Sequence, residues 1–363
     1  MAPLEYSSDT ISASRFRIMP NMTYHLTDTI DLHGKTLILP QNVTLVSKKG
    51  GLIRNGHLKG NGTRINGKAT LFDYVKISGT WIVPIIRTSL FAHLDYDNSL
   101  KDVIALSNPL VKNKIIIDRG EYHVSAVNNG DVILVLNNNT EMILYGKIRL
   151  TPNTYPSYSI LGLFGNNIRI HGKGSVYGDK QSHLGKDGEW GMGIYVTGGN
   201  VSIKDVSVSG CWGDCIYVRT RSDKILIENC NLSDGRRQGI SITSARDVTI
   251  KKCMISNVSG TLPEYAIDVE PNKDEIVDNV IIKNVTVEKC RGGFLVYGKA
   301  SGARVGKVSI NGCKLIDIPK MPISFQKCDS GVVDNCIFKN CKHKELIGQE
   351  GVKNMVRKKI KVE

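Results

Sequence analysis

One short motif repeats between residues 193 and 269: GIYV (193–196), CIYV (215–218), GISI (239–242) and AIDV (266–269). The copies start 22, 24 and 27 residues apart, and a second β-branched run follows each of them, such as VSIK (201–204) after the first. Alternating β-branched runs that are bounded by Gly, Asn, Asp and Ser are typical of strands. A fixed period of this length indicates a repeat architecture.

The cysteines follow the same period. One position of the repeat holds only Val or Cys: Val206, Cys230, Cys253, Val285, Cys313 and Cys336. Buried Cys behaves as a small hydrophobic residue, so this exchange predicts a side chain that points inward. The chain has nine cysteines but no Cys-x-x-Cys pair, which argues against a disulfide framework or a metal site. We therefore expect an interior ladder of free thiols.

Short strands that recur with polar turns predict a parallel β-solenoid. Each coil would stack on the next at roughly 4.8 Å, and no coil could bury its apolar face alone. The spacing does not suit the two-residue hairpins of a sandwich, and the helical crossovers of a doubly wound fold are missing. We predict an all-β protein with a β-rich N-terminal cap (1–100), a single right-handed parallel β-helix (101–345) and a basic C-terminal end (346–363).

Composition narrows the range of partners. The formal net charge is +14 and the isoelectric point about 9.3, which favours a polyanionic partner. Lys and Arg are spread along the chain and no nucleic-acid-binding module is recognised, so we expect an acidic polysaccharide rather than nucleic acid. No apolar run is long enough for a membrane span, and no signal peptide is visible. We expect a monomer or homotrimer that works outside the cell, on a cell surface or in a virion.

The repeat over residues 100–345 resembles the right-handed parallel β-helix proteins of the pectin-lyase-like superfamily. That group includes polysaccharide lyases, polygalacturonases and phage tailspike depolymerases. Two stretches carry the resemblance most clearly, RQGISI (237–242) and AIDVEPN (266–272). It implies the fold and an action on polysaccharide. Neither the Gly-His-Gly of polygalacturonases nor the Asp-Pro-His-Glu of mannuronan epimerases occurs in the sequence.

Side chains alternate between the inside and the outside of a strand, which separates core from candidate site. We expect the isoleucine of each motif, and Leu295 in the next repeat, to point inward, and Val296 to point outward. The outward residues and those at the turn entering each strand then gather on one face. The candidate substrate-binding residues there are Tyr195, Tyr217, Arg219, Arg237 and Gln238, together with Trp190 from a loop (179–191) expected to overhang the face. The candidate catalytic residues are Asp268, Glu270 and Asp214.

The carboxylates favour hydrolysis of a glycosidic bond. Glycosidases use one protonated and one ionised carboxyl group, and inverting enzymes hold them about 6.5–9.5 Å apart. Asp268 and Glu270 lie two residues apart on one strand face, with Cα atoms about 6.5 Å apart, and Asp214 lies two coils away. Mutual repulsion would raise the pKa of one of them, as a general acid requires. In this scheme Arg219, Arg237 and Gln238 position the substrate, and no metal is required.

Two other activities use the same face. A polysaccharide lyase or C5-epimerase would take a proton from a uronate, and the base and the group that neutralises the sugar carboxylate could come from Arg219, Arg237, Tyr217 or Tyr195. Such a lyase could use Ca²⁺ bound by the carboxylate oxygens of Asp268 and Glu270. A non-catalytic adhesin or phage tailspike component would only bind the glycan there.

Overall fold

The computed structural model describes residues 10, 11, 16 and 18–363 of the chain. The chain divides into two compact units. The first comprises residues 1–123 and 139–143, and the second comprises residues 124–138 and 144–363. No helix among the described residues is long and apolar enough to cross a membrane.

In the first unit, several parallel strands pair with one long strand, β6 (Leu52–Asn66). β3 (Thr29–Asp31), β4 (Thr36–Ile38) and β5 (Thr44–Ser47) pair with successive parts of β6, and β7 (Phe72–Ile82) pairs along its length. Trp81 is fully buried against Phe72 in an edge-to-face contact. The remaining elements of this unit are β1 (Thr10–Ile11), β2 (Thr23–Leu26), β8 (Ile85–Arg87), the 3-10 turn η2 (Thr88–Leu90), α1 (Ser99–Ile104) and β9 (Asn113–Ile117). The division between the units falls before the last residue of β10 (Glu121–Val124) and of β12 (Thr140–Leu144).

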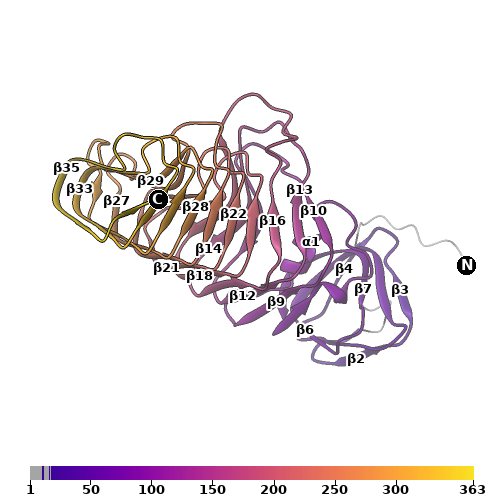
Figure 1. The fold of residues 1–363 in the computed structure, drawn as a ribbon. Helices are drawn as coiled ribbons and strands as arrows, with labels where there is room; N and C mark the ends of the chain where they lie inside the picture. The colour runs from indigo at the N-terminus through magenta and orange to yellow at the C-terminus, as the bar shows by residue number, and fades with distance from the viewer. Residues whose placement is uncertain (1–9, 12–15, 17) are drawn as a thin grey trace, which may run out of the picture. The chain divides into compact units, whose positions relative to one another are not determined.

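The second unit is a parallel β-solenoid in which three strands recur per coil (Figure 1). The first strands of successive coils are β11 (Asp131–Leu136), β14 (Ser157–Phe164), β17 (Trp190–Thr197), β20 (Ile216–Val218), β23 (Ile240–Ile242), β26 (Tyr265–Val269) and β29 (Gly292–Tyr297). The second strands are β15 (Ile168–His171), β18 (Gly199–Lys204), β21 (Ser222–Glu228), β24 (Ala245–Lys251), β27 (Ile276–Lys283), β30 (Arg304–Val305) and β31 (Lys307–Asn311). The long strands β33 (Ile323–Asp334) and β35 (Ile347–Lys358) each form both the first and the second strand of their coil.

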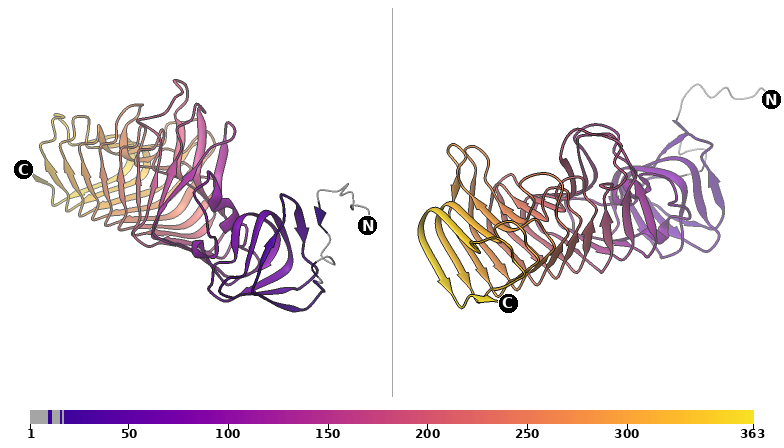
Figure 2. Two further views of the ribbon diagram at one scale, coloured as in Figure 1. Left: turned by 90° about the vertical axis from the view of Figure 1, so that its right-hand side faces the viewer. Right: turned by 45° about the horizontal axis from the view of Figure 1, so that its top comes forward.

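The third strands form a sheet of their own. They are β13 (Lys147–Leu150), β16 (Ser175–Tyr177), β19 (Ser207–Ser209), β22 (Asn231–Ser233), β25 (Met254–Ser256), β28 (Thr286–Glu288), β32 (Lys314–Ile316), β34 (Ile337–Lys339) and β36 (Lys361–Val362). Each pairs in parallel with its equivalent in the next coil, and Figure 2 shows these strands repeating side by side along the solenoid.

Stacked apolar columns hold the coils together. Ile194, Ile216, Ile240 and Ile267 lie in register on β17, β20, β23 and β26, and all four are fully buried. Burial of each side chain requires the coil above and the coil below, because a single coil has no second apolar layer. The predicted parallel β-helix is therefore confirmed.

A sharp bend precedes each third strand and explains the cysteine ladder. The bend residues are in the left-handed region, which Asn, Asp and Gly tolerate best: Asp205, Asn229, Lys252, Asn284, Gly312 and Asn335. The next residue in each coil points inward, and every member of the predicted Val/Cys ladder is buried. All nine cysteines are free thiols, as expected.

One predicted register is wrong. Phe294 stacks on Ile267, so Leu295 takes the outward place beside Asp268 and Val296 points inward with Val269. The small residue of this repeat is Gly293, which moves the motif by one position relative to the expected alignment. An apolar side chain therefore borders Asp268 on that side.

We expect neighbouring isoleucines of β27 to differ sharply in their contribution to stability. Ile282 is fully buried, whereas Ile281 is 38% exposed. Ile282→Ala should lower the free energy of unfolding by about 2–4 kcal/mol because it leaves a cavity between coils. Ile281→Ala should cost under about 1 kcal/mol. Urea unfolding of both variants measures this, and equal losses would contradict the alternation of inward and outward side chains.

Candidate functional site

The outward column of the first strands brings four polar residues into line. Tyr195, Tyr217, Ser241 and Asp268 are direct neighbours across β17, β20, β23 and β26. Two residues beyond Asp268, the Glu270 amide donates to the Ile242 carbonyl and continues the same alignment. The predicted gathering of these side chains on one face of the solenoid is thus present in the structure.

Gln238 links two of the candidate carboxylates. Its backbone N–H donates to Asp214 Oδ1 at 3.1 Å, and its side-chain Nε2 donates to Asp268 Oδ2 at 2.9 Å. Asp214 and Gln238 are fully buried and Asp268 is only 2% exposed. The sequence pattern indicated the outward direction of these side chains but not this burial. The second oxygens, Asp214 Oδ2 and Asp268 Oδ1, accept no hydrogen bond from any described residue.

Asp268 and Glu270 form a close pair. Burial raises the pKa of Asp268 well above its usual range, and the negative charge of the neighbouring Glu270 raises that pKa further. The Arg237 guanidinium opposes this shift. The burial of Asp268 and the neighbouring negative charge of Glu270 therefore both favour the protonated form of Asp268.

Asp214 lies beside a positive charge. Arg237 Nη1 lies 3.7 Å from Asp214 Oδ2, and Arg237 Nε lies 3.5 Å from Glu189 Oε1. Burial raises the pKa of Asp214 to about 6, although the charge of Arg237 acts in the opposite direction. Arg237 and Glu189 are the partly exposed members of this group. They lie at the mouth of the buried carboxyl cluster.

The aromatic candidates occupy the coils before Asp268. The rings of Tyr195 and Tyr217 stack with centroids 5.3 Å apart, and Phe164 meets Tyr195 edge to face at 5.4 Å. Arg219 Nε lies 3.5 Å from Glu275 Oε1, so this arginine is held at the turn beyond the strands. Trp190 begins β17 and is 49% exposed. It is available for stacking on a ligand, although no described contact joins it to the carboxyl cluster.

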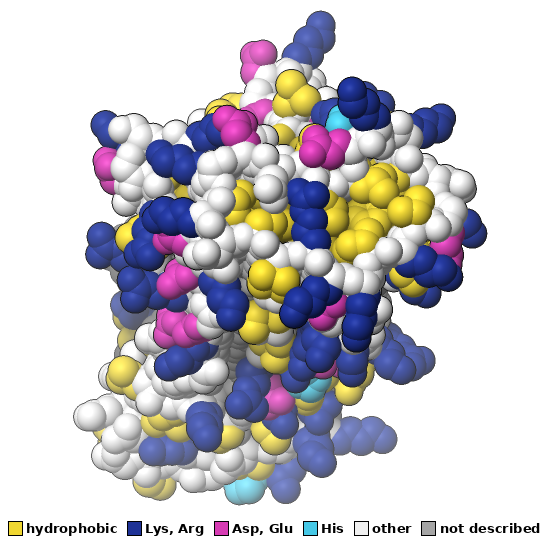
Figure 3. Space-filling view, turned by 60° about the vertical axis from the view of Figure 1, so that its left-hand side comes forward, with side chains coloured by type: hydrophobic (Ala, Val, Ile, Leu, Met, Phe, Trp, Pro, Cys, Tyr) yellow, Lys and Arg dark blue, Asp and Glu magenta, His cyan; other side chains and the backbone are white. Residues whose placement is uncertain are grey.

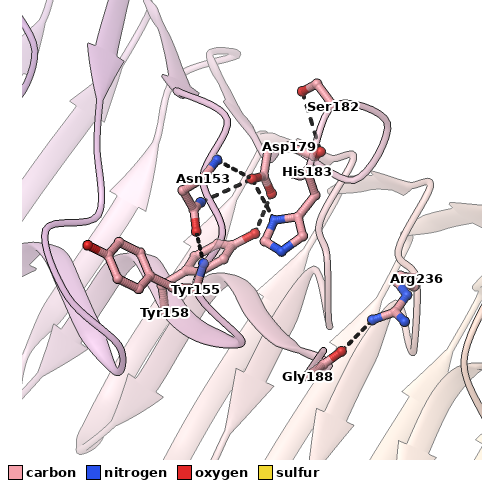
Figure 4. A network of polar contacts seen from close by, with 8 residues as sticks. All are labelled: Asn153, Tyr155, Tyr158, Asp179, Ser182, His183, Gly188 and Arg236. Atoms are coloured by element: carbon pink, nitrogen blue, oxygen red, sulfur yellow. Dashed lines mark hydrogen bonds and ion pairs between the residues drawn. The ribbon is translucent and has the colours of Figure 1, made fainter. Parts of the chain in front are cut away.

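A buried polar network anchors the loop that carries Glu189 (Figure 4). Asp179 accepts hydrogen bonds from Tyr158, from His183 Nδ1 at 2.9 Å, and from the backbone and side-chain nitrogens of Asn153 at 3.2 and 3.0 Å. At the other end of the loop, Arg236 Nη1 donates to the Gly188 carbonyl at 2.6 Å. The loop is therefore fixed on both sides of its predicted overhang.

Two of these anchoring groups also meet at one ring. Arg236 lies 3.7 Å from the centroid of Trp212, and the imidazole of His183 stacks on the same indole at 4.0 Å. The sequence pattern did not predict that Asp179, Trp212 and Arg236 belong to one anchoring network. No local motif indicates that they meet, because Asp179 and Arg236 come from turns that are adjacent only once the coils stack.

The arrangement fits Ca²⁺ poorly. Within the described part of the chain, no group of three or more His, Cys, Asp or Glu side chains is placed to hold a metal ion. Asp268 and Glu270 would supply two carboxylates, whereas Ca²⁺ takes six to eight oxygen ligands. The nearby guanidinium of Arg237 would also repel a cation.

Basic residues are spread over the one face of the molecule that Figure 3 presents. Figure 3 shows Lys and Arg side chains scattered over the face in view, interleaved with Asp and Glu rather than gathered in one patch. The positive net charge therefore acts there as a general field, and specific recognition must come from individual sites.

Three comparisons place this chain among known proteins. Residues 188–307 match the family described as right handed beta helix region. An uncharacterized protein of Bacillus subtilis (strain 168), YclG, is 30% identical over 201 residues, covering 46% of this chain and 34% of that protein. This chain thus spans about a third of the length of that relative.

A solved structure shares the architecture. The endo-xylogalacturonan hydrolase from Aspergillus tubingensis superimposes with a TM-score of 0.54 at 10% identity, over 77% of this chain and 92% of that one. A likeness at this identity concerns the fold alone. With the solenoid topology and the family match over residues 188–307, it shows the fold, which is a right-handed parallel β-helix. The predicted fold class and handedness are confirmed.

Asp214 should make stability depend on pH in a defined direction. Its pKa is raised from 3.8 to about 6, so between these values the folded protein keeps a proton that the unfolded chain has lost. The free energy of unfolding should therefore fall as pH rises from about 4 to 6, by about 3 kcal/mol from this group. Asp214→Asn should remove that fall, while Asp187→Asn on the exposed loop should keep it. Urea unfolding at each pH would contradict the account if wild type and Asp214→Asn changed in parallel.

Proposed function

We propose that this protein hydrolyses glycosidic bonds of an acidic polysaccharide, using the carboxyl cluster of Asp214, Asp268 and Glu270. The observation that carries the proposal is the pair formed by Asp268 and Glu270, joined through Gln238 to the separate carboxyl of Asp214. Two carboxyl groups in environments that shift their pKa values differently are what acid–base hydrolysis needs. The endo-xylogalacturonan hydrolase with the same fold supports the reaction class.

In this proposal Asp268 is the general acid. Burial and the Glu270 carboxylate keep Asp268 protonated, so it can transfer that proton to the glycosidic oxygen as the bond from oxygen to the anomeric carbon breaks. Glu270 is half-buried and lies on the open side, so the sugar approaches from there. Its negative charge also stabilises the positive charge that develops on the sugar ring.

Asp214 is the proposed base. With a pKa of about 6 it is ionised at neutral pH, and Arg237 favours that ionised form. It takes a proton from the water that attacks the anomeric carbon, so one proton enters the leaving oxygen and one leaves the water. Gln238 keeps this carboxyl group apart from Asp268, and inverting hydrolysis uses two such separated carboxyl groups.

Substitution of the two carboxyls tests this reaction. Asp268→Asn and Asp214→Asn should each lower turnover of a cleaved acidic polysaccharide by roughly 10²–10⁴-fold, because each removes a proton-transfer group. Asp187→Asn is the matched control, since it removes an exposed carboxyl of the loop 179–191, and should leave turnover unchanged. Melting temperatures show that the variants are folded. Full activity of Asp268→Asn would overturn the role of this residue.

The type of cleavage separates the remaining possibilities. Across a panel of acidic polysaccharides, we expect new reducing ends without ultraviolet absorbance from an unsaturated sugar. Absorbance together with new reducing ends would identify a lyase. Binding of a polysaccharide without either signal would identify a non-catalytic glycan-binding protein.

A further inference from the structure

The carboxyl cluster around Asp268 holds more negative than positive charge. Asp214 and Glu189 share the guanidinium of Arg237, and no other cation of the described residues forms an ion pair with either carboxylate. The charges of Glu270 and Asp214 both raise the pKa of Asp268, and the charge of Arg237 opposes them. A further carboxylate brought to this place would be repelled by Asp214 and Glu270, while Arg237 is already occupied by two partners.

Five buried polar side-chain atoms of the cluster have no hydrogen-bond partner in the part of the chain that the structure describes. They are Asp214 Oδ2, Arg237 Nε, Gln238 Oε1, Ser241 Oγ and Asp268 Oδ1. Buried polar atoms are nearly always paired in proteins, so a group of unpaired ones indicates a place that a polar ligand completes. In the proposed reaction the two aspartate oxygens act on the glycosidic oxygen and the water. The other three atoms are then left to bind the sugar itself.

Ser241 and Gln238 reach the cluster from neighbouring positions of one coil. Ser241 lies between Tyr217 on β20 and Asp268 on β26 in the outward column, and it is only 1% exposed. Gln238 lies in the turn before β23, where its Nε2 donates to Asp268 and its Oε1 stays unpaired. An amide oxygen only accepts, whereas a serine hydroxyl donates or accepts. A sugar hydroxyl can satisfy both, but a carboxylate has no hydrogen to donate to Gln238.

The approach to the cluster passes two partly exposed side chains. Arg237 and Glu189 are 20% and 27% exposed, whereas the Asp214 side chain is fully buried. Arg237 meets Glu189 and Asp214 as ion pairs at 3.5 and 3.7 Å, and its Nε has no hydrogen-bond partner among the described residues. The guanidinium can therefore turn toward an incoming sugar without breaking a short hydrogen bond, and its Nε can donate to a hydroxyl oxygen.

We propose that the sugar unit whose anomeric carbon is attacked in this cluster is a neutral one, with its hydroxyl groups recognised by Gln238, Ser241 and Arg237. The inference rests on the proposed hydrolysis and names the sugar at its cleavage point. The acidic units that the net charge of +14 attracts then lie elsewhere along the polymer. The substrate is accordingly a heteropolymer that contains both neutral and acidic sugars.

Binding of small sugars tests the site without any turnover. Methyl glycosides of glucose, galactose, mannose, xylose and rhamnose, and of glucuronate and galacturonate, are titrated into the full chain while the side-chain amide signal of Gln238 is followed by NMR. We expect at least one neutral glycoside to shift this signal saturably, and to bind more tightly than either uronate. Ser241→Ala should weaken that binding roughly three- to tenfold, because one hydrogen bond is lost. Ser202→Ala, an outward serine on β18, is the matched control and should leave it unchanged.

A charge change at the mouth of the cluster tests the cause of the preference. Glu189→Gln removes one of the two carboxylates that share Arg237, so a uronate should bind this variant roughly tenfold more tightly than wild type. Asp187→Asn removes an exposed carboxyl of the same loop and should leave uronate binding unchanged. Equal uronate binding by wild type and Glu189→Gln would contradict exclusion of the sugar carboxylate by charge.

The outcomes distinguish this inference from the proposed function. When a heteropolymer is cleaved, borohydride reduction and mass spectrometry identify the sugar at the new reducing end, and we expect a neutral one. A uronate at that end, or cleavage of a polymer made only of uronates, would overturn the neutral sugar and leave the hydrolysis standing. A failure of every neutral glycoside to bind would overturn it as well. Selective binding of a neutral glycoside with no polymer cleaved would support the site and count against the hydrolysis.

Discussion

The stacking of parallel coils in strict register is the constraint on which the rest of this structure depends. Because equivalent strands lie about 4.8 Å apart, whatever one coil places outward is brought beside the outward residue of the next coil. The same register that aligns Ile240 with Ile267 inside the solenoid aligns Ser241 with Asp268 outside it. A polar column and an apolar column therefore arise together from one alternating motif.

Burial turns that column into a chemical site. An exposed aspartate next to a glutamate would be ionised and of little use as an acid. Asp268 is instead buried and accepts a hydrogen bond from Gln238, and the charge of Glu270 lies two residues away on the same strand face. The loop 179–191 also shapes this site. Asp179 and Arg236 hold the loop in place, and Glu189 in the loop forms an ion pair with Arg237.

The sequence predicts which side chains of each coil point inward and outward, but it does not predict how the turns bury some of the outward ones. The isoleucine spacing and the exchange of Val with Cys are properties of single coils, and both identify inward positions correctly. The proximity of Asp268 and Glu270 follows from their spacing of two residues and was predicted, whereas the burial of Asp214 and its link through Gln238 to Asp268 depend on how separate turns pack together. Leu295 shows the limit even within the repeat, because a glycine one position earlier shifts the register.

The central claim is that burial and the neighbouring carboxylate hold Asp268 protonated, and its titration measures this most directly. Carboxyl carbon NMR of protein labelled at aspartate, with Asp268→Asn to assign the signal, gives the pKa of the group. The account predicts a pKa well above the usual aspartate range that falls when Glu270→Gln removes the neighbouring charge. An ordinary aspartate pKa, unchanged by Glu270→Gln, would contradict it.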